Sequence, residues 1–158
     1  MKILLITTST NAVRTTLEQE SDVELFTIDC LAFRQQVLDM LEQATISNPP
    51  DILLTYRCPI IIPKTIYSRA RIGAYNIHPS LLPKYPGLNP WEAIFQNKER
   101  ESGISIHFLS EVPDGGEIVL QDRFQIAEDE TVCVVRKKAD IIAARMAKEL
   151  LNRLTFLR

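Results

Sequence analysis

The sequence lacks the features that mark several common classes of protein. Its 158 residues include only two histidines, and 18 basic side chains are balanced by 20 acidic ones, for a net charge of -2. A nucleic-acid-binding protein normally shows a basic excess, so we expect no nucleic-acid partner. No apolar run approaches the roughly 20 residues that span a bilayer, so we expect no membrane partner either.

Cysteine is also scarce. Cys30, Cys58 and Cys133 are far apart in the chain, form no CxxC pair, and have too few histidines nearby to complete a zinc site. This pattern indicates reduced, mostly buried thiols in a cytoplasmic protein that holds no metal. A nucleophilic role for Cys58, which precedes Pro59 in an expected loop, stays open as the less favoured alternative.

Glycine is missing from the front of the chain, although the whole sequence contains five. Residues 2–7 predict a first strand, and the GxGxxG fingerprint that would follow it in a nucleotide-binding module is absent. The start of the chain carries one positive charge and lacks a small-residue cleavage site, so it predicts this strand and not a signal peptide.

Apolar segments of strand and helix type alternate along the rest of the chain. The length predicts one domain over residues 1–158. We expect a Rossmann-like α/β fold, with a mostly parallel sheet, helices on both faces and an antiparallel C-terminal strand pair. The expected strands are residues 2–7, 23–28, 51–55, 74–78, 103–110 and 117–126, and the expected helices are 11–19, 32–45, 64–69, 90–97 and 130–154.

Two helices show apolar residues at the spacing of a buried face. For the helix at 32–45 the expected core residues are Phe33, Val37, Leu38, Leu41 and Ala44. For the helix at 130–154 they are Val134, Ile141, Ile142, Met146 and Leu150.

The richest motif runs from Asn76 to Pro83 and continues through Lys84-Tyr85-Pro86-Gly87. On a strand, Asn76 and His78 point to the same face, where an amide and an imidazole can converge on one substrate atom. The prolines then force a loop at a strand end, which is where open α/β sheets place their chemistry. The alternative is a hydrogen-bonded structural histidine beside an ordinary loop.

Asp114, followed by two glycines, is the third polar candidate. Asp-Gly-Gly is ordinary hairpin-turn chemistry, but with Asn76 and His78 the carboxylate completes a set able to run acyl transfer. Ser105 and His107 share one face of the preceding strand. They either hold an ordered water or pack in the core.

These residues resemble the folate-dependent formyltransferase family, which includes glycinamide ribonucleotide formyltransferase and methionyl-tRNA formyltransferase. The resemblance extends from about the first strand to Ile126 and is most specific from Asn76 to Gly87. Asn76 and Asp114 are 38 residues apart (114 minus 76), which matches the spacing expected for the family's catalytic Asn-His-Asp set.

The resemblance implies that Asn76, His78 and Asp114 transfer a formyl group from 10-formyltetrahydrofolate to a primary amine, without a metal. The Asn76 amide and a protonated His78 would donate hydrogen bonds to the oxyanion of the intermediate. Asp114 would raise the proton affinity of His78 and help to accept the proton that the amine loses.

The resemblance also implies a folate pocket formed by the loop after the third parallel strand and the loop that leads to the aspartate. By position, the residues assigned to it are Tyr56, Arg57, Pro59, Ile60, Ile61, Ile62, Leu109, Val112, Pro113 and Asp114.

The acceptor amine is less determined than the donor. Relatives that act on glycinamide ribonucleotide hold its phosphate with a glycine-rich turn after the first strand, and this chain has none there. Residues 79 and 84–87 look like the ribonucleotide enzymes, whereas residues 88–94 look closer to the tRNA and sugar branch. We expect a small-molecule amine, either glycinamide ribonucleotide or an aminosugar-type amine. The residues assigned to it are Thr8, Ser9, Thr10, Asn11 and Pro79.

Two alternatives share the same motif. One is a 10-formyltetrahydrofolate hydrolase, in which water replaces the amine. The other is a folate-binding domain with reduced catalysis, because the region before Asn76 is short for the family. A complete methionyl-tRNA formyltransferase is not expected, since the last helix is followed by no further domain and the charge shows no tRNA footprint. The sequence predicts no oligomeric state.

Overall fold

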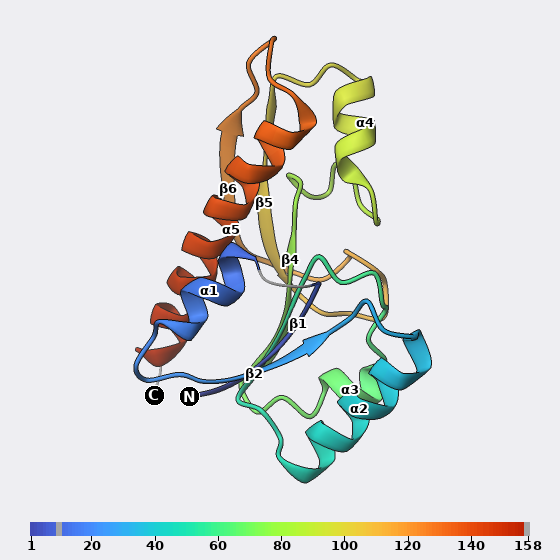
Figure 1. The fold of residues 1–158 in the computed structure, drawn as a ribbon, viewed down its shortest axis with the longest axis vertical. Coiled ribbons are helices and arrows are strands. Elements are labelled where there is room, and N and C mark those ends of the chain that lie inside the picture. Colours follow the sequence, from blue (N-terminus) through green and yellow to red (C-terminus); the bar gives the residue numbers. More distant parts are fainter. Residues whose placement is uncertain (9–10, 157–158) are drawn as a thin grey trace.

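The computed structural model describes residues 1–8 and 11–156, which build one six-stranded sheet in the order β2-β1-β3-β4-β5-β6 (Figure 1). The strands are β1 (Lys2–Thr7), β2 (Glu24–Asp29), β3 (Ile52–Tyr56), β4 (Gly73–His78), β5 (Glu101–Phe108) and β6 (Ile118–Gln125). Strands β1 to β4 pair in parallel. The β4–β5 and β5–β6 pairs are antiparallel, so the predicted mixed sheet is confirmed.

Helices cover both faces of this sheet. They are α1 (Ala12–Glu18), α2 (Arg34–Ser47), α3 (Lys64–Tyr67), α4 (Pro90–Gln96) and α5 (Val132–Thr155). Helices α1 and α5 lie side by side on one face, and α2 and α3 lie on the other (Figure 1). The expected Rossmann-like arrangement is therefore present.

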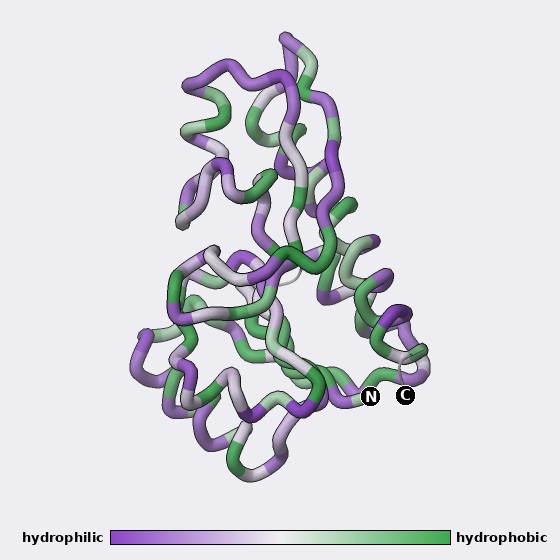
Figure 2. Tube along the Cα trace, turned by 180° about the vertical axis from the view of Figure 1, so that it is seen from behind, coloured by the Kyte–Doolittle hydropathy of each residue, from purple (hydrophilic) through white to green (hydrophobic). Residues whose placement is uncertain are grey.

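The central strands are apolar because both of their faces are covered. All five residues of β3 are buried, as are the last five of β1. Figure 2 shows the resulting hydrophobic colouring in the middle of the molecule and more hydrophilic colouring at its periphery. A sheet buried on both faces leaves the strand ends as the place for polar chemistry.

The buried face of α5 differs from the predicted one. Val134 and Ile141 are exposed, whereas Met146 and Leu150 are buried as expected. The residues that face the core are Val135, Ala139, Ala143, Ala144, Met146, Ala147, Leu150 and Leu151. The prediction was therefore wrong at Val134 and Ile141, and four of the eight core-facing residues are alanines, which allow close packing of α5 against α1 and the sheet.

Phe33 was also assigned wrongly to a core face. Helix α2 begins at Arg34, two residues after the predicted start, so Phe33 is its N-cap, and the Phe33 side chain is 80% exposed. Val37 and Leu41 are fully buried, as predicted. Within residues 1–8 and 11–156, no helix combines the length and the hydrophobicity that crossing a bilayer requires.

Candidate active site

Polar side chains from four segments meet at the carboxyl ends of β3 and β4. Thr55 lies on β3, and Asn76 and His78 lie on β4. His107 is the direct cross-strand partner of Asn76 on β5. Asp114 reaches this group from the loop between β5 and β6, so residues far apart in the chain form one cluster.

The loop that carries Asp114 is held tightly against β5. A Cβ at Gly116 would lie 1.8 Å from the Phe108 carbonyl oxygen, an approach that only glycine permits. Asp114 itself has a φ of 53°, in the left-handed region that aspartate tolerates better than most residues. The Asp-Gly-Gly turn therefore places its carboxylate over the end of β4.

Asp114 is the centre of the cluster. Its Oδ1 lies 3.2 Å from Asn76 Nδ2 and 3.5 Å from His78 Nδ1, so the three predicted catalytic side chains are brought together. His107 Nε2 lies 3.5 Å from the same oxygen and 3.1 Å from Asn76 Nδ2. His107 thus belongs to the cluster itself, as its fourth member.

The orientation of the Asn76 amide is set by Thr55. The Thr55 hydroxyl donates to Asn76 Oδ1 at 2.7 Å, which turns Nδ2 toward Asp114 and His107. The carboxylate can only accept hydrogen bonds, so it favours the same orientation. The sequence did not identify Thr55 as a site residue, because a threonine near the end of an apolar strand has no distinctive pattern.

Backbone carbonyls fix the tautomers of both histidines. His78 Nε2 lies 2.9 Å from Tyr85 O, and His107 Nδ1 lies 2.8 Å from Phe108 O. A carbonyl oxygen only accepts, so these two ring nitrogens carry hydrogen. In a neutral His78 ring, Nδ1 is then free to accept.

Burial lowers the pKa of His78 below its ordinary value, despite opposing effects from the Tyr85 carbonyl and Asp114. Burial alone would raise the pKa of Asp114, but the contacts from His107 and the Gly87 N–H outweigh it and lower this pKa. Near neutral pH the site therefore holds an ionised Asp114 and a neutral His78. Asp114 does raise the pKa of His78, as expected, but burial lowers this pKa by more.

The loop after β4 closes over the cluster through two backbone groups. Gly87 N–H donates to Asp114 Oδ2 at 2.7 Å, and Gly87 has a φ of 97° that suits glycine. Tyr85 supplies the carbonyl that binds His78, and its hydroxyl donates to Glu99 at 2.7 Å. The sequence marked these residues as the end of a motif, without indicating that they contact the two catalytic candidates.

Ser105 lies on the same strand as His107 but has a different role. Its hydroxyl donates to Ser80 O at 2.6 Å and accepts from Leu82 N–H at 3.1 Å and from Gln121 Nε2 at 2.9 Å. These contacts tie the loop after β4 to β5 and β6. Ser105 therefore anchors the loop.

Two cavities meet at this cluster. The inner cavity, of about 70 Å³, is lined by Thr55, Cys58, Ile60, Ile61, Ile62, Asn76, His107, Leu109, Ser110, Pro113 and Asp114. The outer cavity, of about 430 Å³, is lined by Thr8, Arg57, Cys58, Pro59, Asn76, Ile77, His78, Pro79, Gly87, Leu88, Asn89, Pro90, Trp91 and Arg136. Asn76 and Cys58 line both cavities.

Most residues assigned to the folate pocket line the inner cavity. They are Ile60, Ile61, Ile62, Leu109, Pro113 and Asp114. Arg57 and Pro59 line the outer cavity. Tyr56 and Val112 line neither: Tyr56 is buried with its hydroxyl bonded to Asp140 of α5, and Val112 is exposed.

The residues assigned to the acceptor are divided. Thr8 and Pro79 line the outer cavity, whereas Asn11 is the N-cap of α1 and donates to Thr7 Oγ1 at 2.7 Å. Ser9 and Thr10 lie outside the described residues. Within residues 1–8 and 11–156 there is no cluster of three side chains suited to hold a metal ion.

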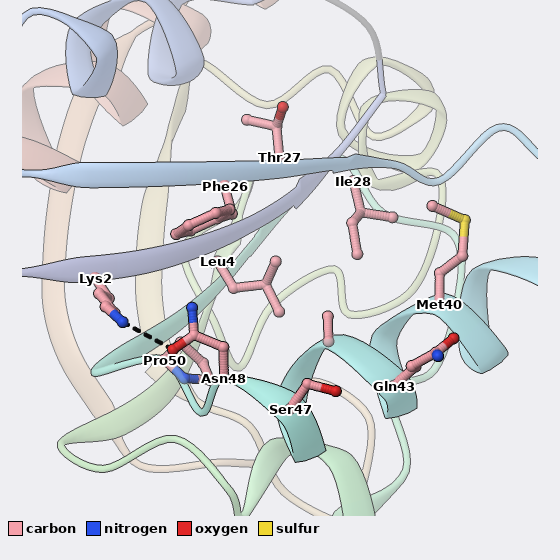
Figure 3. A pocket seen from close by; sticks show the side chains of 11 residues that line it. Lys2, Leu4, Phe26, Thr27, Ile28, Met40, Gln43, Ser47, Asn48 and Pro50 are labelled. Atoms are coloured by element: carbon pink, nitrogen blue, oxygen red, sulfur yellow. Dashed lines mark hydrogen bonds between the residues drawn. The ribbon is translucent and has the colours of Figure 1, made fainter.

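A third cavity lies away from this cluster, between β2 and α2 (Figure 3). This apolar groove, of about 450 Å³, is lined by Lys2, Leu4, Phe26, Thr27, Ile28, Met40, Gln43, Ala44, Ser47, Asn48 and Pro50. Its polar contact is the hydrogen bond from Lys2 Nζ to Asn48 Oδ1 at 2.8 Å, drawn in Figure 3.

Comparison with known proteins gives the family. The model of the formyl transferase family matches residues 2–151, so this chain belongs to that family. A methionyl-tRNA formyltransferase from Kosmotoga olearia is 33% identical over 106 residues, which are 67% of this chain and 34% of that protein. The chain thus spans about a third of the length of the curated relatives that it matches.

Solved structures share the fold. Glycinamide ribonucleotide transformylase 1 from Symbiobacterium toebii superposes with a TM-score of 0.78 at 18% identity, covering 94% of this chain and 84% of that one. Phosphoribosylglycinamide formyltransferase from Streptococcus pneumoniae gives 0.77 at 19% identity, covering 98% and 99%. At this level of identity the likeness establishes the fold alone.

Proposed function

We propose that this chain transfers a formyl group from 10-formyltetrahydrofolate to a primary amine of a small molecule. The observation that carries the proposal is the position of Asn76, whose side chain lies where the inner and outer cavities meet. A formyl donor in one cavity and an amine in the other would meet at its amide. Asp114 and His78 lie beside this point to handle the proton.

The inner cavity suits the formyl-bearing end of the donor. Three isoleucines and Leu109 supply apolar walls, and Asn76, His107 and Asp114 form its polar end. Sites for drug-sized ligands usually span roughly 300–1,000 Å³, and this cavity measures about 70 Å³. Seating the whole pterin therefore requires that the loop at 58–62 and the loop at 109–114 move apart.

Asn76 would stabilise the oxyanion that forms when the amine attacks the formyl carbon. Its Nδ2 carries two hydrogens, which face Asp114 and His107. The formyl oxygen would replace one of these two partners as the acceptor. A hydrogen bond of this type is worth about 2.7–4 kcal/mol in activation free energy.

Asp114 and His78 would accept the proton that the amine loses. Asp114 is ionised, and His78 presents an unprotonated Nδ1 because Nε2 donates to Tyr85 O. Collapse of the tetrahedral intermediate breaks the bond to N10 of the folate, which takes up a proton as tetrahydrofolate leaves. Removing one proton acceptor typically slows such a reaction about 10²- to 10⁴-fold.

The outer cavity supports a small acceptor that carries negative charge. Two arginines, Arg57 and Arg136, line it, although Arg57 is also paired with Asp140, and Trp91 and Leu88 contribute apolar surface. Glycinamide ribonucleotide, or an aminosugar that carries a phosphate, fits this combination. We further propose that residues 1–158 act as one catalytic domain in the cytoplasm, which agrees with three free thiols.

The test measures formyl transfer with a panel of amines, alongside the donor alone. Amine-dependent formation of tetrahydrofolate that Asn76→Ala lowers about 10²- to 10³-fold is the expected result. Asn152→Ala, at an exposed position on α5, is the matched control. Rapid formate release without an amine would instead identify a hydrolase, and donor binding without turnover would identify a folate-binding domain.

A further inference from the structure

Two cysteines that the proposed reaction does not use lie together behind the candidate site. Cys30 directly follows β2, and Cys58 follows β3 by two residues, so they flank the end of β1. Cys30 N–H donates to Thr7 O at 3.1 Å, which holds Cys30 over that strand. Its Sγ lies 3.9 Å from the carbonyl oxygen of Arg57, the residue that precedes Cys58, so the two cysteines are neighbours.

The two thiols differ in accessibility. Cys30 is buried in the core formed by α2, α3 and the sheet. Cys58 is only partly buried and lines both the inner and the outer cavity. A small solute that enters the site can therefore reach Cys58, whereas Cys30 is only 2% exposed.

Their ionisation differs in the same sense. The neighbouring Cys30 thiol, opposed by burial and helped by the backbone contact at Ile60, lowers the pKa of Cys58. The neighbouring Cys58 thiol and burial raise the pKa of Cys30. Thiolates are the reactive form of cysteine, so Cys58 is the nucleophile of the pair and Cys30 stays protonated.

We propose that Cys58 is a site of oxidation by peroxides and that Cys30 closes a disulfide with it. The Cys58 thiolate attacks one oxygen of hydrogen peroxide, so an S–O bond forms and the O–O bond breaks. The products are a sulfenic acid and hydroxide, which takes up a proton to become water. Cys30 then gives up its proton as its sulfur attacks the Cys58 sulfur, the S–O bond breaks, and the hydroxide released takes up that proton and leaves as a second water.

The disulfide would change the wall of the site. Cys58 Sγ now lies 3.6 Å from Ile60 O, at the start of the segment that lines the inner cavity. Bonding to Cys30 draws Cys58 toward the core and displaces that segment. The expected loss of formyl transfer rests on the proposed function, whereas the oxidation chemistry does not.

Peptide mapping tests the pair directly in the wild-type protein. Reduced protein is treated with hydrogen peroxide, alkylated and digested with trypsin, which places the three cysteines in separate peptides, 15–34, 58–64 and 124–136. We expect the loss of two of the three free thiols and a cross-linked peptide that joins 15–34 to 58–64. Full alkylation of Cys58 after peroxide, or a cross-link through Cys133, overturns the proposal.

Single substitutions assign the roles. Cys30→Ser should leave a Cys58 sulfenic acid that dimedone captures, and Cys133→Ser, at an exposed thiol on α5, should cross-link as the wild type does. Equal dimedone labelling of Cys58 and Cys133 in Cys30→Ser contradicts the assignment. The wild-type mapping decides the proposal even when Cys30→Ser is unstable.

Activity is the second measurement. Peroxide should lower formyl transfer in both the wild type and Cys133→Ser, and dithiothreitol should restore it. A cross-linked protein with unchanged activity would contradict the effect on the cavity. A reduced protein without formyl transfer would contradict the proposed function and leave the mapped disulfide in place.

Discussion

The candidate site and the apolar groove between β2 and α2 are hollows of similar size, about 430 Å³ for the outer cavity and about 450 Å³ for the groove. They differ in the polar groups that they contain. The site gathers an amide and two imidazoles around a single carboxylate oxygen of Asp114. In the groove, the Lys2 ammonium donates a hydrogen bond to the Asn48 amide oxygen, and Phe26 and Met40 also line it (Figure 3).

This contrast shows that volume is a poor guide to chemistry in this protein. A reaction needs groups that converge on one point with shifted protonation, and the site supplies them through His78 and Asp114. The groove offers apolar contact area without such convergence. Substitutions in the two regions should therefore have effects of very different size.

The largest effect is expected from Asp114→Asn. This change keeps the shape of the side chain and removes the charge, so the proton acceptor beside Asn76 and His78 is lost. Formyl transfer should fall about 10²- to 10⁴-fold in kcat/KM. Asp39→Asn, on the exposed side of α2 near the groove, is the matched control. An equal fall in kcat/KM in both variants would show that the two regions do not differ in their importance for the reaction.

Thr55→Val should produce the next largest loss. It removes the hydroxyl that orients Asn76 and leaves the amide oxygen without its donor, at a cost of about 1–3 kcal/mol. We expect kcat to fall about tenfold, measured at saturating donor, with little change in KM. Thr45→Val replaces a fully buried threonine of α2 and should lower stability without lowering kcat. Unchanged kcat in Thr55→Val would show that Asn76 keeps its orientation without this hydrogen bond.

The pH dependence of stability should separate the site from the rest of the protein. Burial lowers the pKa of His78 from its ordinary 6.5, so the unfolded chain binds this proton more readily than the folded one. The contribution of neutral His78 is thus fully present above pH 6.5 and is lost as the pH falls toward the lower folded pKa. The pKa of Asp114 is also lowered, from 3.8, so its contribution is lost at more acidic pH.

The substitution His78→Gln removes the contribution of His78 to the pH dependence of stability. Urea unfolding between pH 7 and pH 5 should show a steeper loss of unfolding free energy in the wild type, by at most about 1.4 kcal/mol per pH unit. Identical slopes in the two proteins would mean that His78 is not held neutral by burial.

The smallest effect is expected in the groove. Met40 is 55% exposed on α2, so Met40→Gln should change the free energy of unfolding by about 0.5 kcal/mol or less and leave formyl transfer unchanged. Thermal unfolding and the amine-dependent assay measure the two quantities. A loss of activity comparable to that of Asp114→Asn would assign the groove to the reaction.

Local patterns were sufficient to predict the elements and half of the site. Alternation along β4 placed Asn76 and His78 on one face, and the register of β4 with β5 adds His107 to them. The interpretation of α5 failed at Val134 and Ile141, because residue size was taken as a sign of burial. Close helix packing selected the alanines instead.

Partners that act through the backbone left no signal in the sequence. Tyr85 contributes its carbonyl and Gly87 its N–H, so the identity of their side chains does not predict these contacts. Tyr56 stands next to the predicted folate loop, yet it points to Asp140 on α5. Such contacts depend on where distant segments pack.

The order of side chains thus defined an α/β sheet, a strand end with an amide and an imidazole, and a formyltransferase resemblance, because these depend on local periodicity and residue chemistry. Packing across 38 residues brought the Asp114 carboxylate to Asn76. Packing also buried His78 in its neutral form and set Cys30 against Cys58. Burial and long-range contacts control the ionisation of these groups, and neither can be predicted from a local sequence pattern.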